Sequence, residues 1–278
     1  TQMDGMQLPA AAALTARYGA GAEPKLGPWN DTMALLLSHR SVRGYRPDAL
    51  PEGTLESLIA AAQSAATSSN LQTWSVVAVN DPEKRKALAE IAGGQRHIEQ
   101  CPIFLVFIAD VSRNERLGQQ EGVSLAGMPF LETFLVAAID AGLAAQNAVV
   151  AAESMGLATL YIGALRNDVP RVAAMLGLPP GAAPVFGLCV GYAAPGKESA
   201  VKPRLSQEAV LHHETYSTTK EKALRASYDE KLSEYSKRYD MAADNWSQRV
   251  ISRIGSISAL RGRDGLKAAL RSLGFPLK

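Results

Sequence analysis

One stretch of the chain, residues 130–167, limits what the protein can fold into more than any other. Its first part, residues 130–155, has no proline and only three charges, and its apolar side chains recur at the spacing of a helix. Gly156 then supplies a C-terminal stop. The apolar run 158–162 that follows predicts a buried strand, ended by Gly163. We therefore expect a long helix that feeds directly into a buried strand.

The character of this helix indicates where it lies. A run this apolar could cross a bilayer, but Glu132, Asp140 and Glu153 spread charge along it, which favours a helix buried by the protein. Its many alanines leave smooth surface on several sides, so that neighbouring elements can approach closely. We therefore expect a central or interface helix, with Ala145 and Ala148 as candidates to face a second subunit.

Strands and helices alternate in the rest of the chain. Buried strands are expected at 74–79, 103–109 and 184–191, and helices at 32–38, 54–63, 82–91 and 169–176. The polar segment 111–128 is expected to be a surface excursion. Residues 1–30 would form an N-terminal arm with one short helix, and residues 220–278 are helical in character. This order indicates an α/β or α+β fold in which helices cover a sheet.

Composition excludes several classes of protein. The 278 residues are 47% hydrophobic, enough for one substantial core or two modest ones, and the formal charge of +2 is dispersed, which does not indicate a nucleic-acid partner. No charge-free stretch suggests a membrane anchor. Cys101 and Cys189 lack metal-ligand spacing and are expected to be buried, reduced thiols. The start has no secretory pattern, which favours a cytoplasmic protein if Thr1 is near the native start.

Two clusters of cations lack an evident structural role. His39, Arg40, Ser41 and Arg43 follow a purely apolar helical turn, and Lys202 and Arg204 flank a proline. Either cluster can be a solvated surface. Either can also bind a phosphate, for which arginine offers planar, bidentate donors.

Three further features are ambiguous or negative. The segment 66–72 holds small hydrogen-bonding residues and reads as a polar turn, and His97 reads as a structural hydrogen-bonder. Adjacent side chains diverge, so a metal site at His212 and His213 is not favoured. The Gly-rich segment 19–24 is not a dinucleotide fingerprint, because no strand precedes it and the third glycine is missing.

The order of these clusters is more informative than any one of them. HRSVRGY, ATSSNLQTW, GGQRH, AQNAVVAAESMGLATLYIGALRN and FGLCVGY…KPRL follow one another along the chain. Together they resemble the nitroreductase superfamily, and most closely its NADPH-dependent, oxygen-insensitive nitroreductases and flavin reductases. The resemblance covers residues 39 to about 246.

The resemblance implies an α+β fold, with a central, mostly antiparallel sheet flanked by helices and the long central helix at a homodimer interface. Residues 31–215 would form the FMN-binding core, 1–30 an N-terminal arm and 216–278 a C-terminal helical excursion. The implied activity is ping-pong electron transfer from NADPH, through FMN, to a small-molecule acceptor: a nitroaromatic compound, a quinone or free flavin. No protein nucleophile is implied, because the flavin carries the hydride. The alternatives are an FMN-storing or FMN-sensing protein, and a dehalogenase or quinone reductase on the same scaffold.

The resemblance also assigns residues. Arg40, Lys202 and Arg204 would surround the FMN phosphate, with His39 and Ser41 completing the first segment and Arg43 facing the pyrimidine side of the ring. Gln95 would contact the polar ring edge, and Ser68, Ser69 and Asn70 would reach the flavin from the other subunit. The run along the isoalloxazine would be Tyr161, Ile162, Gly163, Ala164, Leu165 and Arg166.

Two points of the assignment concern individual positions. Family members commonly carry a second glycine where this chain has Ala164, so a methyl group could crowd the flavin or change the backbone angle. NADPH would be held through its 2′-phosphate by C-terminal arginines, for which Arg238, Arg261 and Arg263 are the candidates. The resemblance does not select between Arg261 and Arg263.

Overall fold

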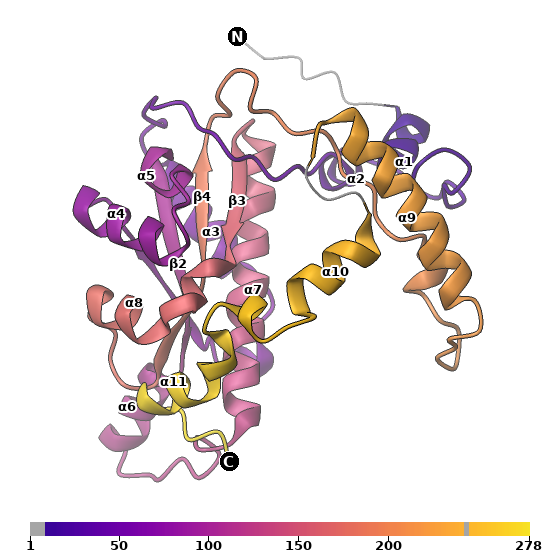
Figure 1. The fold of residues 1–278 in the computed structure, drawn as a ribbon. Helices are drawn as coiled ribbons and strands as arrows, with labels where there is room; N and C mark the ends of the chain where they lie inside the picture. Colours follow the sequence, from indigo (N-terminus) through magenta and orange to yellow (C-terminus); the bar gives the residue numbers. More distant parts are fainter. Residues whose placement is uncertain (1–8, 242–244) are drawn as a thin grey trace. The chain divides into compact units, whose positions relative to one another are not determined.

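A computed structural model describes residues 9–241 and 245–278 of the chain. The first eight residues of the predicted N-terminal arm lie outside these ranges. The chain divides into two compact units, which we call the helical unit (Thr1–Arg40 and Ser199–Leu260) and the sheet unit (Ser41–Glu198 and Arg261–Lys278). Figure 1 follows the chain through both.

The sheet unit is built on four strands in the order β1-β2-β4-β3, with every neighbouring pair antiparallel. The strands are β1 (Trp74–Ala78), β2 (Ile103–Asp110), β3 (Ala158–Ile162) and β4 (Ala182–Gly191). The fold is therefore α+β, with an antiparallel central sheet as predicted. The three segments expected at 74–79, 103–109 and 184–191 are strands, although β4 begins two residues earlier than expected.

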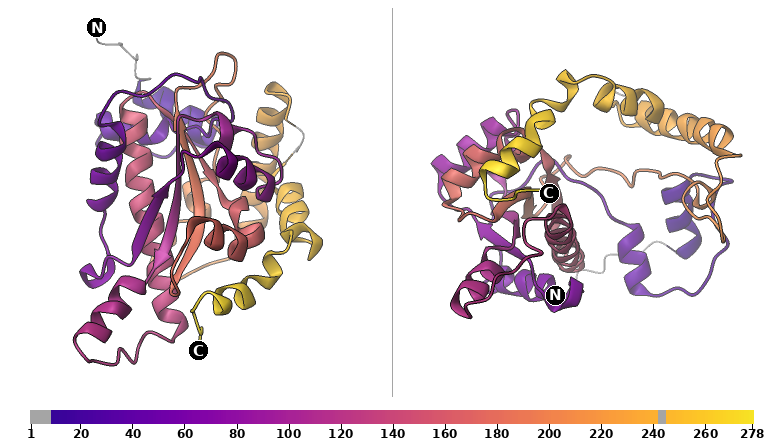
Figure 2. Two further views of the ribbon diagram at one scale, coloured as in Figure 1. Left: turned by 90° about the vertical axis from the view of Figure 1, so that its left-hand side faces the viewer. Right: turned by 90° about the horizontal axis from the view of Figure 1, so that it is seen from below.

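Side chains alternate along β2, and each face of the sheet is covered by helices. Phe104, Val106 and Ile108 point into one core cluster, whereas Leu105 and Phe107 point into another. The first cluster is closed by α4 (Pro82–Ile91), α5 (His97–Gln100) and α8 (Val169–Leu176), and the second by α3 (Thr54–Gln63) and α7 (Leu131–Ser154). These two helical layers lie on opposite faces of the sheet (Figures 1 and 2).

The long helix α7 spans 24 residues, close to the predicted bounds, and is long and apolar enough to cross a membrane. Its buried alanines instead pack into the second core cluster, so it is a core helix. Ala145 and Ala148 are fully buried there with Leu105 and Phe107. The expectation that they face a second subunit is therefore wrong, because small residues let α7 approach its own sheet closely.

The remaining elements of the sheet unit lie around this framework. They are η1 (Ser68–Asn70), α6 (Ser112–Gln120), η2 (Gly163–Asp168), η5 (Arg263–Gly265) and α11 (Leu266–Ser272). α6 lies in the segment expected to be a surface excursion. Phe275 and Leu270, from the C-terminal end, complete a third core cluster with residues of β2 and α7.

The helical unit combines an N-terminal segment with a segment from residues 199–260. It contains α1 (Ala10–Tyr18), α2 (Asp31–Leu37), η3 (Gln207–Ala209), α9 (Glu221–Arg238), α10 (Trp246–Ile254) and η4 (Ser258–Leu260). The Asn30 side chain caps α2 by accepting from the Met33 N–H at 2.9 Å. The single short helix expected in the N-terminal arm is α1.

Candidate functional site

The first predicted binding segment is attached to the sheet. Ser41 pairs with Thr159 in a parallel bridge, and the Val42 N–H donates to the Thr159 carbonyl at 3.1 Å. Farther on, Tyr45 pairs with Ala193 just past the end of β4. Ser41 therefore lies beside β3, the strand that leads into the predicted ring-binding run.

That run leaves β3 at Tyr161 and turns into the η2 helix. The Tyr161 ring meets Phe186 edge-on, with centroids 5.1 Å apart, and its hydroxyl donates to Gln146 at 3.3 Å. Burial, together with the nearby Glu153 carboxylate, raises the pKa of the Tyr161 hydroxyl, so the group stays protonated. The residue is still 36% exposed, which leaves part of the ring on the surface.

The alanine that departs from the family pattern causes no backbone strain. Ala164 is not among the described residues with positive φ, and its side chain packs against the first core cluster. Its methyl group is thus accommodated by the protein interior. The neighbouring Gly163 is approached by Arg166, whose guanidinium donates to the Val185 carbonyl at 2.6 Å.

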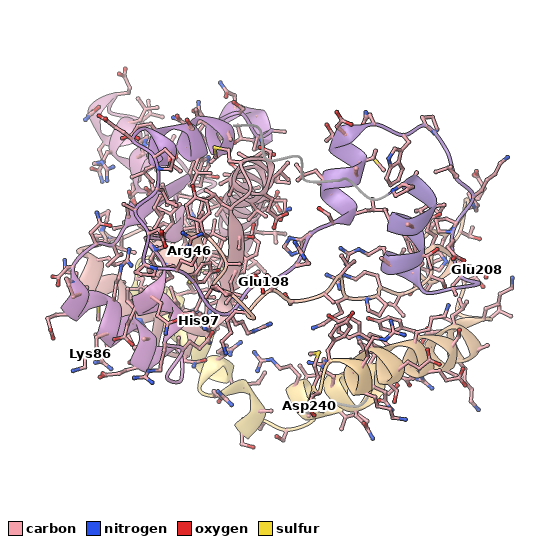
Figure 3. The ribbon with its side chains drawn as sticks, turned by 90° about the horizontal axis from the view of Figure 1, so that it is seen from above. Arg46, Lys86, His97, Glu198, Glu208 and Asp240 are labelled. Carbon is pink, nitrogen blue, oxygen red and sulfur yellow. The ribbon has the colours of Figure 1, made fainter. Side chains whose placement is uncertain are left out.

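Gln95 is held in one orientation. Its amide nitrogen donates to the Ala92 carbonyl at 2.9 Å, which leaves its oxygen to accept from the His97 Nε2–H, also at 2.9 Å. Burial and the nearby Arg43 lower the pKa of His97, which favours the neutral ring. His97, labelled in Figure 3, therefore acts as the structural hydrogen-bonder that the sequence suggested.

Arg43 opens onto a cationic cavity of about 450 Å³ in the sheet unit. Arg96, His97 and Lys197 also line it. Within residues 9–241 and 245–278, Arg43, Arg96 and Lys197 have no ion-pair partner. The cavity is suited to an electron-rich group such as the pyrimidine edge of a flavin.

The polar turn at Ser68–Asn70 is organised by one buried carboxylate. Asp140 of α7, only 2% exposed, accepts from the Thr67 hydroxyl at 2.5 Å, the Ser68 N–H at 3.2 Å and the hydroxyl and N–H of Thr73 at 3.0 and 3.2 Å. The turn that these bonds anchor contains Ser69 and Asn70 at positive φ, a conformation that costs free energy in residues other than glycine. Both side chains are exposed on the protomer.

In the helical unit, the start of the first predicted segment and the Lys202–Arg204 segment meet at Arg17. The Arg17 guanidinium donates to the carbonyls of His39 and Lys202, at 2.9 and 2.7 Å. Arg40 and Arg204 are the next cations along each segment. The predicted phosphate set of Arg40, Lys202 and Arg204 therefore comes from two segments that one side chain joins.

The surroundings of Arg204 fit an anionic group. Buried Tyr228 donates to the Pro203 carbonyl at 2.8 Å, and the charges of Arg204, Arg249 and Arg17 partly offset the burial that raises its pKa. The Arg249 Nε and Nη2 atoms are buried and have no hydrogen-bond partner among the described residues. Guanidinium N–H donors therefore outnumber the acceptors here, and the oxygens of a phosphate dianion would accept hydrogen bonds from the unpaired donors.

The C-terminal arginines are in two places. Arg261 and Arg263 belong to the sheet unit, where Arg263 donates to the Asn167 side chain at 2.9 Å and the Arg261 guanidinium lies against Gly93. Arg238 is the last residue of α9 in the helical unit, near Asp240 (labelled in Figure 3). Arg263 therefore lies beside Asn167, the residue that follows the predicted ring-binding run. Arg261 lies beside Gly93, which shortly precedes Gln95 in the sequence.

A separate cavity of about 590 Å³ in the helical unit contains no predicted site residue. It is lined by the segment around His212 and His213, by the start of α9 and by Trp246. His212 lies against the Tyr216 ring, 4.1 Å between centroids. In the described residues, no group of three or more His, Cys, Asp or Glu side chains is placed to hold a metal ion.

Sequence reasoning missed Arg17, Asp140 and Tyr228. Arg17 lies in an arm to which the sequence assigns no role, and in the sequence Asp140 is only a charge that argues against a membrane span. Their burial is the sign of a role, because charged residues are seldom fully buried without partners. A charged residue within an apolar helical pattern was the available signal for Asp140.

Comparison with known proteins gives consistent matches along the chain. The profile of the nitroreductase family matches residues 36–192, and that of the nitroreductase family C-terminal domain matches residues 202–278. A Bacillus subtilis "FMN reductase (NADPH)" is 37% identical over 228 residues, which cover 80% of this chain and 91% of the relative. A Salmonella typhimurium "Oxygen-insensitive NADPH nitroreductase" is 38% identical over 221 residues, covering 79% and 89%.

Solved structures match as well. Bacillus megaterium NfrA2 superimposes with a TM-score of 0.84 at 39% identity, covering 90% of this chain and all of the other. The Vibrio harveyi NADPH:FMN oxidoreductase, solved in complex with NAD⁺, gives a TM-score of 0.80 at 34% identity, with the same coverage.

Proposed function

The chain belongs to the nitroreductase family, and from that premise we propose that it is an FMN-dependent oxidoreductase that takes electrons from NADPH. The acceptors are nitroaromatic compounds, quinones or free flavin, reduced in a ping-pong sequence. The observation that carries the proposal is the meeting of the Arg40 segment and the Lys202–Arg204 segment at Arg17, which gathers cations for a phosphate. The names of the relatives supply the cofactor and the electron donor.

The protein's own groups bind and orient. Arg40, Lys202 and Arg204 hold the phosphate, with His39 and Ser41 completing the first segment. Arg43 faces the pyrimidine side, where a cation stabilises the negative charge that develops on reduction. FMN, when bound, supplies the hydride chemistry. No side chain acts as a nucleophile.

The ring-binding residues lie mainly in the sheet unit. Gln95, fixed by Ala92 and His97, presents its amide to the polar ring edge. The isoalloxazine lies along Tyr161, Ile162, Gly163, Ala164, Leu165 and Arg166.

We propose a homodimer formed through α7. Leu131, Leu135, Ile139 and Leu143, spaced four residues apart, are each 45 to 55% exposed, which is unusual for a run of large apolar side chains. The second subunit would cover this stripe, hereafter the α7 stripe. Ser68, Ser69 and Asn70, exposed on the protomer, would then reach the flavin of the other subunit.

Arg261 is the candidate that best fits the NADPH 2′-phosphate. Arg263 donates to the Asn167 side chain, whereas Arg261 is an exposed residue. Arg261 also adopts φ +50°, and an αL backbone in a residue that is not glycine often marks a functional position. Arg238, exposed at the end of α9, is a second contact.

Two broader assignments complete the proposal. Residues 31–215 form the FMN-binding core, with 1–30 as an arm and 216–278 as a helical excursion. The enzyme acts in the cytoplasm. Two free, buried cysteines support a reducing compartment.

The experiment is to purify the protein with FMN and follow NADPH oxidation with and without nitrofurazone or a quinone. We expect a yellow protein that carries FMN, not FAD, and oxidation that accelerates when the acceptor is added. A protein that binds FMN but oxidises NADPH no faster with acceptor would be a flavin carrier or sensor.

A further inference from the structure

Arg17 is a buried cation at the end of α1. The residue is 7% exposed, and its guanidinium donates to three main-chain carbonyls: Leu37 at 2.8 Å, His39 at 2.9 Å and Lys202 at 2.7 Å. A buried charge costs considerable free energy unless hydrogen bonds compensate it. The three carbonyls compensate the buried charge of Arg17, and the same hydrogen bonds hold these carbonyls close to one another.

The three acceptors belong to two segments far apart in the sequence. Leu37 is the last residue of α2 and His39 directly precedes Arg40, whereas Lys202 lies 185 positions beyond Arg17. The backbone adds a fourth link, because the Arg204 N–H donates to the Arg17 carbonyl at 2.9 Å. Arg17 thus fixes the main chain on both sides of the phosphate set.

Arg40, Lys202 and Arg204 carry like charges on the two segments that Arg17 joins, and like charges oppose being brought together. A main chain already fixed in the binding geometry spares the ligand the cost of ordering it. The planar fork of arginine can reach several carbonyls at once, which a lysine ammonium cannot do with the same geometry.

We propose that Arg17 is a positioning residue that preforms the phosphate end of the FMN site. This inference rests on the proposed function. It also gives the N-terminal arm a role: α1 carries Arg17 into place, with Ala13 and Leu14 buried beside it.

The test compares FMN with riboflavin, which has the same ring and no phosphate. Apoprotein of the wild type, Arg17→Met and Arg17→Lys is titrated with each flavin, and binding is followed by flavin fluorescence. We expect Arg17→Met to weaken FMN binding about tenfold to a hundredfold while riboflavin binding changes less than about twofold. Arg17→Lys should fall between, since it keeps the charge but loses the fork.

Thr15→Ala is the matched control. Thr15 lies on the same helix, and among the described residues its hydroxyl bonds only to the Ala11 carbonyl and the Glu23 carboxylate. This variant should bind both flavins as the wild type does. Unchanged riboflavin binding in the Arg17 variants also shows that they are folded, and Arg17→Lys decides the matter if Arg17→Met does not fold.

Two results would overturn the inference while leaving the proposed function intact. One is an equal loss of FMN and riboflavin affinity in the Arg17 variants, which would make Arg17 a general structural residue. The other is an unchanged FMN affinity. A wild-type protein that binds neither flavin would overturn the proposed function together with the inference.

Discussion

At the scale of single residues, the structure shows side chains whose importance depends on partners distant in the sequence. Asp140 bonds to groups 67 to 73 positions away, and Arg17 reaches across 185 positions. Local patterns do not contain such pairings, so the sequence could propose cations for a phosphate but not the buried residues that hold their segments. His39–Arg43 and Lys202–Arg204 were visible because their polarity contrasts with their neighbours.

The first prediction concerns Asp140. Asp140→Asn keeps the shape of the side chain but replaces an acceptor by a donor among the groups of Thr67, Ser68 and Thr73. Each donor left unsatisfied costs about 1–3 kcal/mol, so we expect a clear loss in the free energy of unfolding, measured by urea denaturation. Glu132→Gln, an exposed carboxylate at the start of the same helix, is the control and should change stability little.

The Asp140 variant also tests the role of the turn. If the Ser68–Asn70 turn contacts flavin, Asp140→Asn should weaken FMN binding as well as stability. A destabilised protein that keeps its full FMN affinity would separate the turn from the flavin site.

The second prediction concerns pH. The folded-state pKa of His97 lies below its unfolded value, so the neutral ring contributes stability that is present above about pH 6.5 and is lost as the pH falls through that region. We expect the melting temperature of the wild type to drop between pH 7 and pH 5. His97→Gln should show a smaller drop, and an equal drop in both proteins would assign the effect to other groups.

The third prediction separates the C-terminal arginines. Arg261→Ala should lower kcat/KM for NADPH by about fivefold to a hundredfold, because one phosphate contact is worth about 1–3 kcal/mol. NADH should be nearly unaffected and FMN should stay bound. Arg263→Ala should mainly lower the melting temperature, since it loses Asn167. Replacing Arg238, Arg261 and Arg263 together by alanine should raise KM for NADPH more than Arg261→Ala does alone.

Steady-state kinetics with both nucleotides decide the matter. Equal losses for NADPH and NADH in Arg261→Ala, or a wild-type preference for NADH, would show that this segment does not read the 2′-phosphate.

At the scale of elements, the sequence predicted helices well where local signals bound them. Asp81 and Pro82 start α4, and Asp168 and Gly177 bound α8, so both helices match their expected ranges. α6 was missed, because a polar surface helix has no apolar stripe to reveal it. The prediction that Ala145 and Ala148 of α7 face a second subunit was wrong. Alanines occur on several sides of this helix, so the sequence does not indicate which side packs against the sheet.

The fourth prediction tests the α7 stripe as a dimer interface. The double variant Ile139→Glu/Leu143→Glu places two charges where a partner would bury apolar surface, so we expect sedimentation to show monomers that have lost FMN. Leu117→Glu on α6 is the control, because Leu117 is 55% exposed but lies outside the stripe. A variant that remains a flavin-loaded dimer would exclude the stripe from the interface.

At the scale of the whole molecule, the family and the α+β fold followed from the order of five motifs along the chain. The division into a sheet unit and a helical unit did not, because the helical unit unites two segments that are far apart in the sequence. The residues that the resemblance assigned to phosphate and to ring fall in different units. The sequence could propose these residues, but only the structure shows which contacts position the phosphate set and which position the ring-binding residues.

The most direct test of the account is a half-reaction without acceptor. FMN-loaded protein is mixed anaerobically with NADPH while the flavin absorbance is recorded, and nitrofurazone is added afterwards. We predict that one equivalent of NADPH bleaches the flavin and that nitrofurazone restores its colour, as a ping-pong enzyme requires. A flavin that stays oxidised in excess NADPH would contradict the claim that this protein transfers electrons from NADPH.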